Sequence, residues 1–319
     1  MQFLVRRLMI TLITLFLASV LSFAAFSLIP GDPVSLMLGI DATEEQILSL
    51  RTELGLDQNP VVQYSRWLGR FLSGNLGNSV RFRGEPILGM IRERLPITLT
   101  LGSMALVLIC LMALPLALLA AYKEGSWLDR LVSTLSTVTI ALPGFFLGVL
   151  WIWLFGILLK SFTPGAYVPY QEDHLGFVAY LALPALALAI PNAAVVIKFL
   201  RDSLLQQLRS DYVRTAFSKG ASRTWVLCRH VLKNALIPAL TVMGMIVGEL
   251  LTGSIVIEQV FGIPGLGRLL IAAIMSRDYP LIQTLVVYIA SMVILANTLV
   301  DLGIQALDPR LRLAGGGGI

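Results

Sequence analysis

The 319-residue chain is 56% hydrophobic and 13% charged, and its net charge is +5 at pH 7. Soluble domains carry roughly 25% charged residues, so this chain has too few polar side chains to cover a surface in water. These values exclude an ordinary soluble protein and indicate an integral membrane protein in contact with lipid. The basic excess is then expected in loops on the cytoplasmic side of the membrane, not at a nucleic-acid interface.

Six apolar segments are long enough to cross the hydrocarbon core as helices, which takes about 20 residues each. In chain order the segments are 9–29, 97–122, 131–159, 175–197, 235–257 and 279–300. The first is longer than the apolar part of a secretory signal sequence, roughly 7–15 residues, so we expect it to remain as a transmembrane helix. The third exceeds the length needed, and Pro143-Gly144 predicts a kink or a tilt within it.

Basic residues in the short loops predict which side of the membrane each loop occupies. Arg6 and Arg7 precede the first segment, and the loop 198–234 carries eight Lys or Arg residues against two Asp residues. Positively charged loops stay in the cytoplasm, so both sites are expected there. Six spans then place the N- and C-termini in the cytoplasm and the segment 30–95 outside the membrane.

The segment 30–95 is too long to be a plain connector. Thr43, followed three residues later by Gln46, forms a capping-box pattern that predicts a helix ending at Gly55. A second helix is predicted over 61–72, where aromatic and apolar residues recur at helical spacing. We therefore expect an extracytoplasmic loop that folds into a small helical cap.

The segment 200–234 combines helix and turn signals. Leucines recur every four residues from Leu200, so the fourth span is expected to continue as a helix beyond the membrane. Ser210-Asp211 offers an N-cap for a short helix, and Gly220 offers its C-terminal glycine. Ser222 can cap a further helix over 223–233, which leads into the fifth span.

A short helix placed between two turns would be held at the membrane surface by helices that enter the bilayer. Ala216 is small enough to let another surface approach, and Gly220 allows a sharp turn that a residue with a Cβ resists. A partner that pushes on this helix would move the fourth and fifth spans together. The alternative is an ordinary cytoplasmic loop with a solvated basic surface.

This segment resembles the coupling segment of bacterial ABC importer permeases, whose pattern is Glu-Ala-Ala, three residues, Gly, and a later Leu-Pro. Here Arg214-Thr215-Ala216 precedes Gly220 at the same spacing, and Ile237-Pro238 follows. The first two positions depart from the general pattern and are typical of the peptide/nickel branch. Further matching fragments are Pro30-Gly-Asp-Pro33, Glu53-Leu-Gly-Leu-Asp57, Leu76-Gly77, Glu258 to Arg268, Arg277-Asp-Tyr-Pro280 and Asp308-Pro-Arg310.

The resemblance implies an all-α integral membrane protein with six transmembrane helices and type I ABC importer permease architecture. It implies one permease domain over 1–319 in the bacterial cytoplasmic (inner) membrane, importing short peptides or nickel chelates. The implied partners are a homologous second permease, two ATPase subunits and an extracytoplasmic solute-binding protein that faces the outer loop. The residues that would contact the ATPase are Asp211, Tyr212, Arg214, Thr215, Ala216, Lys219 and Gly220.

The sequence contains no Gly-x-x-x-x-Gly-Lys phosphate loop. ATP and Mg²⁺ are therefore expected in the ATPase partners, and this chain is expected to have no cofactor and no catalytic residues. Cys110 and Cys228 form no disulfide or metal pattern. His174 and His230 are predicted on opposite sides of the membrane, so no metal site is expected. The glycine-rich tail 315–319 is expected to be flexible.

Glu249 lies inside the fifth apolar segment. A carboxylate within a membrane is costly, so Glu249 is a candidate for a pore residue that meets a cationic substrate, or else it makes a helix contact. The alternative function is a stand-alone secondary transporter driven by an ion gradient. Such a protein is expected to have inverted repeats or a cluster of intramembrane ionisable groups. A membrane scaffold, the second alternative, would not need a capped coupling helix.

Overall fold

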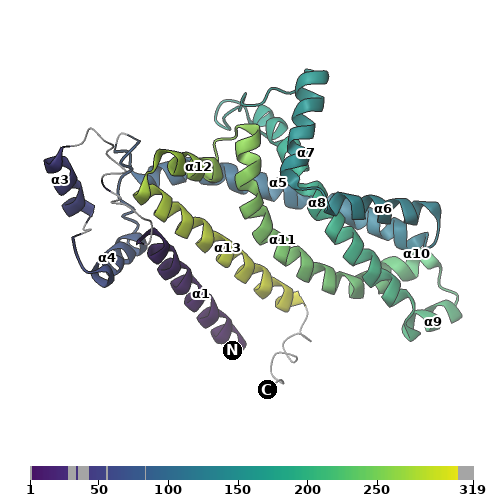
Figure 1. The fold of residues 1–319 in the computed structure, drawn as a ribbon. Helices are drawn as coiled ribbons and strands as arrows, with labels where there is room; N and C mark the ends of the chain where they lie inside the picture. The colour runs from purple at the N-terminus through teal and green to yellow at the C-terminus, as the bar shows by residue number, and fades with distance from the viewer. Residues whose placement is uncertain (1, 28–33, 35–42, 55–56, 83, 308–319) are drawn as a thin grey trace. The chain divides into compact units, whose positions relative to one another are not determined.

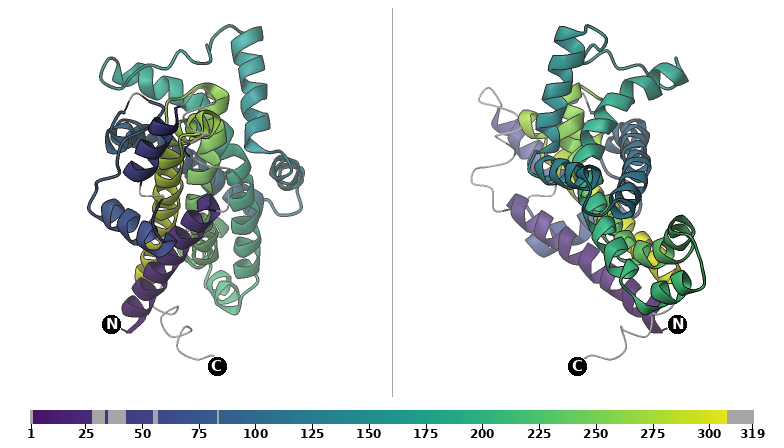
Figure 2. Two further views of the ribbon diagram at one scale, coloured as in Figure 1. Left: turned by 60° about the vertical axis from the view of Figure 1, so that its left-hand side comes forward. Right: turned by 90° about the vertical axis from the view of Figure 1, so that its right-hand side faces the viewer.

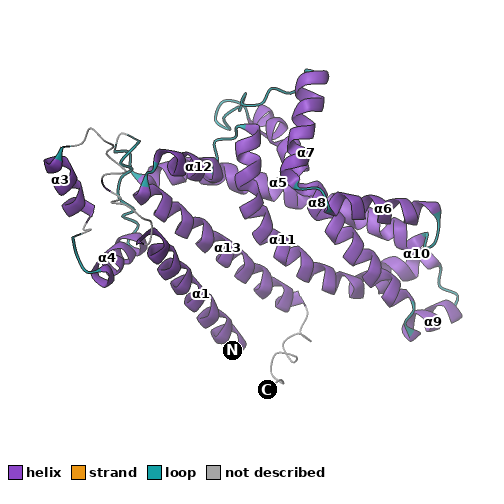
Figure 3. Ribbon diagram, in the orientation of Figure 1, coloured by secondary structure: helices purple, strands orange, loops and turns teal. Residues whose placement is uncertain are grey.

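The computed structural model describes residues 2–27, 34, 43–54, 57–82 and 84–307, which form helices and loops and contain no β-strand (Figures 1 and 3). The chain divides into two compact units, one of residues 1–98 with 264–295 and one of residues 99–263 with 296–319. Four predicted features lie outside the described residues, namely Pro30-Gly-Asp-Pro33, Gly55, Asp308-Pro-Arg310 and the tail 315–319.

Within the described part of the chain, five helices are long and apolar enough to cross a membrane. They are α1 (Gln2–Ser27), α5 (Ile87–Tyr122), α8 (His174–Leu208), the continuous helix Arg223–Phe261 that ends in α11 (Leu232–Phe261), and α13 (Tyr279–Leu307). They correspond to five of the six predicted segments. Helices α5 and α13 each contribute to both units.

The third predicted segment is broken rather than merely kinked. It forms α6 (Trp127–Ile140) and α7 (Gly144–Trp151), and α7 continues as the π-helix η1 (Ile152–Leu158). The two parts are bent by 99°, so the sixth candidate span is either a broken span or a re-entrant loop. The break falls where it was predicted, because Pro143 has no N–H to continue α6 and serves as the N-cap of α7.

Both helices predicted within the segment 30–95 are present as α3 (Glu44–Leu54) and α4 (Pro60–Leu72). The predicted capping box is confirmed, because the Thr43 N–H donates to Gln46 Oε1 at 3.0 Å and the Gln46 N–H donates to Thr43 Oγ1 at 3.3 Å. Helix α4 begins after Asn59, whose side chain accepts from Val61 N at 3.0 Å. The Asn59 cap was not predicted from the sequence.

The aromatic residues of α4 pack on α1, which runs beside it in Figures 1 and 2. The rings of Tyr64 and Trp67 lie 5.4 and 6.3 Å from the ring of Phe23 in α1. The Tyr64 hydroxyl lies 2.8 Å from Ser19 Oγ. The periodic aromatic residues of α4 therefore serve to fasten it to α1.

In the unit formed by residues 1–98 and 264–295, the remaining core packs around the start of α5, α12 (Leu266–Ser276) and the start of α13. The buried core residues are Ile87, Met90, Ile91, Leu266, Leu269, Ala273, Leu281, Ile282 and Leu285.

Asp278, between α12 and α13, is fully buried. Its carboxylate accepts from Ser79 Oγ, from Arg81 N at 3.0 Å and from Leu281 N at 3.3 Å. This carboxylate therefore caps α13 and ties it to residues 79–81, shortly before α5.

Replacement of Asp278 by alanine should destabilise this unit by about 2–4 kcal/mol, because three donors, two of them buried, lose their acceptor. Thermal unfolding of the detergent-purified protein measures the effect. Asp57→Ala, at an exposed position of the same unit, is the matched control and should change stability by less than about 0.5 kcal/mol. Equal melting temperatures for the two variants would contradict the assignment.

Candidate functional site

The short helix predicted after Ser210 is present as α9 (Asp211–Ser218), between α8 and α10 (Arg223–Val226) (Figure 2). Gly220 has φ +82°, which confirms the left-handed turn predicted after the helix. Ser222 caps α10, since its hydroxyl accepts from Trp225 N at 3.4 Å. The cap role predicted for Ser210 is only partly correct, because its hydroxyl donates to Gln207 O at 2.5 Å and accepts no helix N–H.

One face of α9 is inserted into the core of the larger unit. Val213 is fully buried, and Ala216 packs against the same core while remaining half-buried. The other buried core residues come from α5, α8, α10, the π-helix η2 (Leu227–Val231) and α11, and are Ala117, Ala121, Leu200, Leu204, Val226, Leu227, Val231, Ala235 and Ala239. Helix α9 is thus fixed to the ends of three apolar helices by shared apolar contacts.

Tyr212 adds a polar connection on both sides of α9. Its hydroxyl donates to Gln207 Oε1 at 2.8 Å, near the end of α8. It accepts from Asn234 Nδ2 at 3.2 Å, near the start of α11. Gln207 and Asn234 were not predicted, because spacings of 5 and 22 residues across turns leave no periodic signal in the sequence.

The opposite face of α9 is exposed. The side chains of Asp211 and Arg214 are 100% and 80% exposed and form only a loose pair at 3.9 Å. The other five predicted residues line an open depression, together with Trp225 and His230. These five are Tyr212, Thr215, Ala216, Lys219 and Gly220.

Aromatic side chains surround this depression without being buried. Trp225 is 51% exposed, and its ring meets that of His230 edge-on at 4.7 Å. Tyr212, which also lines the depression, is 39% exposed, and Phe217, elsewhere on α9, is 42% exposed. Exposed aromatic residues beside basic ones are typical of a protein docking surface. Trp225 and Phe217 were not predicted, since nothing in the sequence pattern distinguishes them from core residues.

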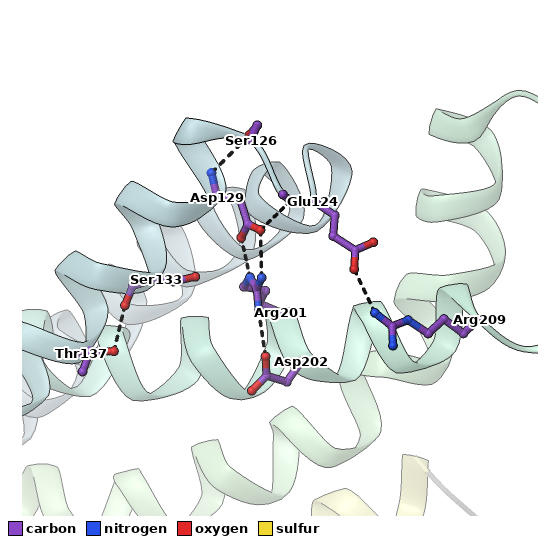
Figure 4. Close-up of polar contacts among 9 residues, drawn as sticks. Glu124, Ser126, Asp129, Ser133, Thr137, Arg201, Asp202 and Arg209 are labelled. Carbon is purple, nitrogen blue, oxygen red and sulfur yellow. Dashed lines mark hydrogen bonds and ion pairs between the residues drawn. The ribbon is translucent and has the colours of Figure 1, made fainter.

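A second set of contacts ties the turn between α5 and α6 to α8 (Figure 4). Arg201 binds Asp129 in a bidentate manner, with Nε to Oδ1 at 2.6 Å and Nη2 to Oδ2 at 2.9 Å. The same carboxylate accepts from Gly125 N at 2.9 Å. Eight residues after Arg201, at the C-cap of α8, the exposed Arg209 pairs with Glu124 at 3.0 Å. From the sequence, both arginines were interpreted only as positive charge of a cytoplasmic loop.

Glu249 lies on α11, on the exposed side of that helix. It follows the start of α11 by 17 positions, which is roughly 25 Å along the helix axis. The structure therefore does not bring Glu249 together with the residues of α9. Within the described residues, no group of three or more His, Cys, Asp or Glu side chains lies close enough together to hold a metal ion.

Two family models match the chain. "Binding-prot-dependent transport system membrane comp, N-term" matches residues 1–102, and "Binding-protein-dependent transport system inner membrane component" matches residues 113–313.

Relatives align over nearly the whole chain. A Sinorhizobium fredii protein named as a peptide ABC transporter permease is 36% identical over 310 residues, which cover 97% of this chain and 99% of the relative. A Brucella abortus protein named as a peptide transport system permease is 38% identical over 93% of this chain and 94% of its own length.

The glutathione transport system permease protein of Salmonella paratyphi A is 37% identical over 98% of this chain and 99% of its own length. These matches and the helical membrane architecture lead to one conclusion. The chain belongs to the inner membrane components of binding-protein-dependent transport systems, as a permease subunit of the peptide/nickel type of ABC importer.

Proposed function

We propose that this permease carries short peptides into the cell. The relatives described above are named for peptide or glutathione transport, which favours this substrate class. Nickel chelates, the other substrate expected from the resemblance, are named for none of these three relatives. In this family of permeases ATP hydrolysis resides in a separate ATPase subunit and the solute is delivered by a binding protein.

The observation that carries the proposal is that α9 has one buried face and one exposed face. Val213 buries one face of the helix in the core that α5, α8 and α11 share, while Thr215, Lys219 and Gly220 lie at the surface. An ATPase subunit docked on the exposed face would push on a helix that cannot move without α8 and α11. ATP-driven motion of the partner would thereby alternate access to the transport path.

We also propose which side of the membrane each segment faces. The N- and C-termini, with the coupling segment 200–234, face the cytoplasm, because these regions carry the basic residues. The segment 30–95 faces the binding protein on the outer side. The chain acts as one permease domain over 1–319 and pairs with a homologous second permease and two ATPase subunits, which bind ATP and Mg²⁺. A stand-alone secondary transporter is not favoured, because the family is one of binding-protein-dependent systems.

The test of the function is uptake by the complete complex reconstituted in vesicles. With the binding protein, a short peptide and ATP, the proposal predicts peptide accumulation that stops when ATP is omitted. Accumulation driven by an ion gradient without ATP would overturn it.

Replacement of Gly220 by valine should uncouple ATP hydrolysis from transport. The φ of +82° strains a β-branched residue by about 1–3 kcal/mol, so the turn must change and re-aim α9. A Cβ at Gly220 would meet no atom of this chain within 4 Å, so the chain itself should still fold. We expect the import per ATP hydrolysed to fall by about tenfold, roughly 1.4 kcal/mol.

Gly69→Val, in a glycine of α4 that also has open space around it but no positive φ, is the matched control and should leave coupling unchanged. Ala216→Trp fills the depression beside the docking face and should uncouple in the same way as Gly220→Val. Normal coupled transport in both coupling-segment variants would contradict the assignment.

Replacement of Asp129 by asparagine should also weaken coupling, because it loosens the connection between α6 and α8. It leaves Arg201, whose side chain is 20% exposed, without its buried partner, at a cost of about 2–4 kcal/mol. Asp202→Asn is the matched control, because Asp202 pairs with the same Arg201 at 3.0 Å but is 61% exposed. That change should cost less than about 1 kcal/mol.

Thermal unfolding and import per ATP are the two measurements for this pair. The double variant Asp129→Asn with Arg201→Gln should recover part of the lost stability, because the only charge it leaves without this partner, Asp202, is 61% exposed. Equal effects of the two single variants would contradict a mechanical role for the pair.

A further inference from the structure

A polar stripe runs along α11. From Pro238 to Phe261, every exposed residue falls on one face of the helix. At 100° per residue these positions fall within about 80° of the helix circumference. Beyond Pro238 the stripe consists of Thr241, Met245, Glu249, Thr252, Val256 and Gln259.

The direction of this stripe is fixed by close packing elsewhere on the helix. A Cβ on Gly244 would come within 2.7 Å of Val300 Cγ1, and one on Gly248 within 2.7 Å of Asn297 Oδ1. The last part of α13 therefore contacts α11 at two successive glycines. Leu250, Ser254 and Ile257, on a further face of α11, are buried as well. Rotation of α11 to hide the stripe would break these contacts.

The composition of the stripe does not suit lipid. Helix α5 exposes apolar side chains such as Val107, Leu111 and Leu114, as a lipid-facing helix does. The stripe on α11 contains neither Leu, Ile nor Phe, but it contains a carboxylate and an amide. A carboxylate facing hydrocarbon costs several kcal/mol, so such residues face a water-filled cavity or a partner.

Glu249 is the charged residue of the stripe, and its carboxylate needs a partner from outside this chain. Thr241 and Thr252 donate to backbone carbonyls of their own helix, Ile237 O at 3.4 Å and Glu249 O at 3.1 Å. The carboxylate of Glu249 makes no hydrogen bond or ion pair with any residue that the structure describes. It lies eight residues from the end of the apolar run at Ile257, which is about 12 Å along the helix.

We infer that this stripe lines the water-filled transport path and that Glu249 binds an ammonium or guanidinium group of the cargo as it passes. This inference rests on the proposed function as a peptide permease. A carboxylate exposed to water and open to the path attracts a cation and disfavours an anion. Glu249 thereby sets a preference for cationic over anionic cargo, separate from the selection made by the binding protein.

The test compares two dipeptides of opposite side-chain charge, lysylalanine and glutamylalanine, taken up by the same vesicles containing the complete complex. Because the ratio of the two uptake rates is measured in one preparation, differences in assembly cancel. Glu249→Gln should lower the ratio of lysylalanine to glutamylalanine by about threefold to tenfold, and Glu249→Lys should lower it further. Glu249→Asp should keep the ratio near that of the native chain.

Glu172→Gln makes the same chemical change in an exposed loop and should leave the ratio unchanged. An unchanged ratio in both Glu249→Gln and Glu249→Lys would overturn the inference while leaving the proposed function intact. If the native complex imports neither peptide, the proposed substrate class fails, and the cargo role of Glu249 fails with it.

A second measurement tests the water-filled path without any cargo. With Cys110 and Cys228 replaced by serine, Glu249→Cys should react with a membrane-impermeant cationic thiol reagent. Leu111→Cys, on the apolar exposed face of α5, should not react. An unreactive cysteine at position 249 in the assembled complex would mean that the stripe faces a partner subunit or lipid, and this result would overturn the inference.

Discussion

The burial of Val213 is the interaction on which the coupling arrangement depends. Helix α9 has eight residues, which is too short for a stable isolated helix in water, for which about 12–15 residues are needed. It is stable here because Val213 completes an apolar core formed by α5, α8, α10 and α11. The contacts that fold α9 are therefore the contacts that hold the apolar helices together, and a force on α9 reaches all of them.

Polar contacts extend this core beyond the reach of apolar side chains. Tyr212 connects α9 to the end of α8 and to the start of α11, and the Asp129–Arg201 pair connects α8 to the first turn of α6. In the other unit, the buried Asp278 connects the segment before α5 to α13 in a comparable way. Asp129 and Asp278 also accept from the backbone N–H groups of Gly125 and Arg81, which lie in turns and have no helical partner.

Local signals in the sequence were sufficient for the parts of the fold that depend on neighbouring residues. The apolar segments gave five spans, Gly220 gave the end of α9, Ser222 gave the start of α10, and Thr43 with Gln46 gave the start of α3. Pro143 predicted the position of the break in the third segment but not its 99° angle, because packing sets the size of a bend. The Asp129–Arg201 pair joins residues 72 positions apart, so no local pattern could reveal it. Whether Trp225 is exposed likewise depends on the tertiary fold.

Cross-linking from single cysteines on α9 tests the central claim most directly, that an ATPase subunit docks on its exposed face. With Cys110 and Cys228 replaced by serine, Thr215→Cys and Lys219→Cys would be introduced separately into the assembled complex and labelled with a short thiol-reactive photo-cross-linker. The account predicts a cross-link to the ATPase subunit from both positions and none from Thr137→Cys, an exposed position on α6. Cross-links from Thr137→Cys with none from α9 would contradict it.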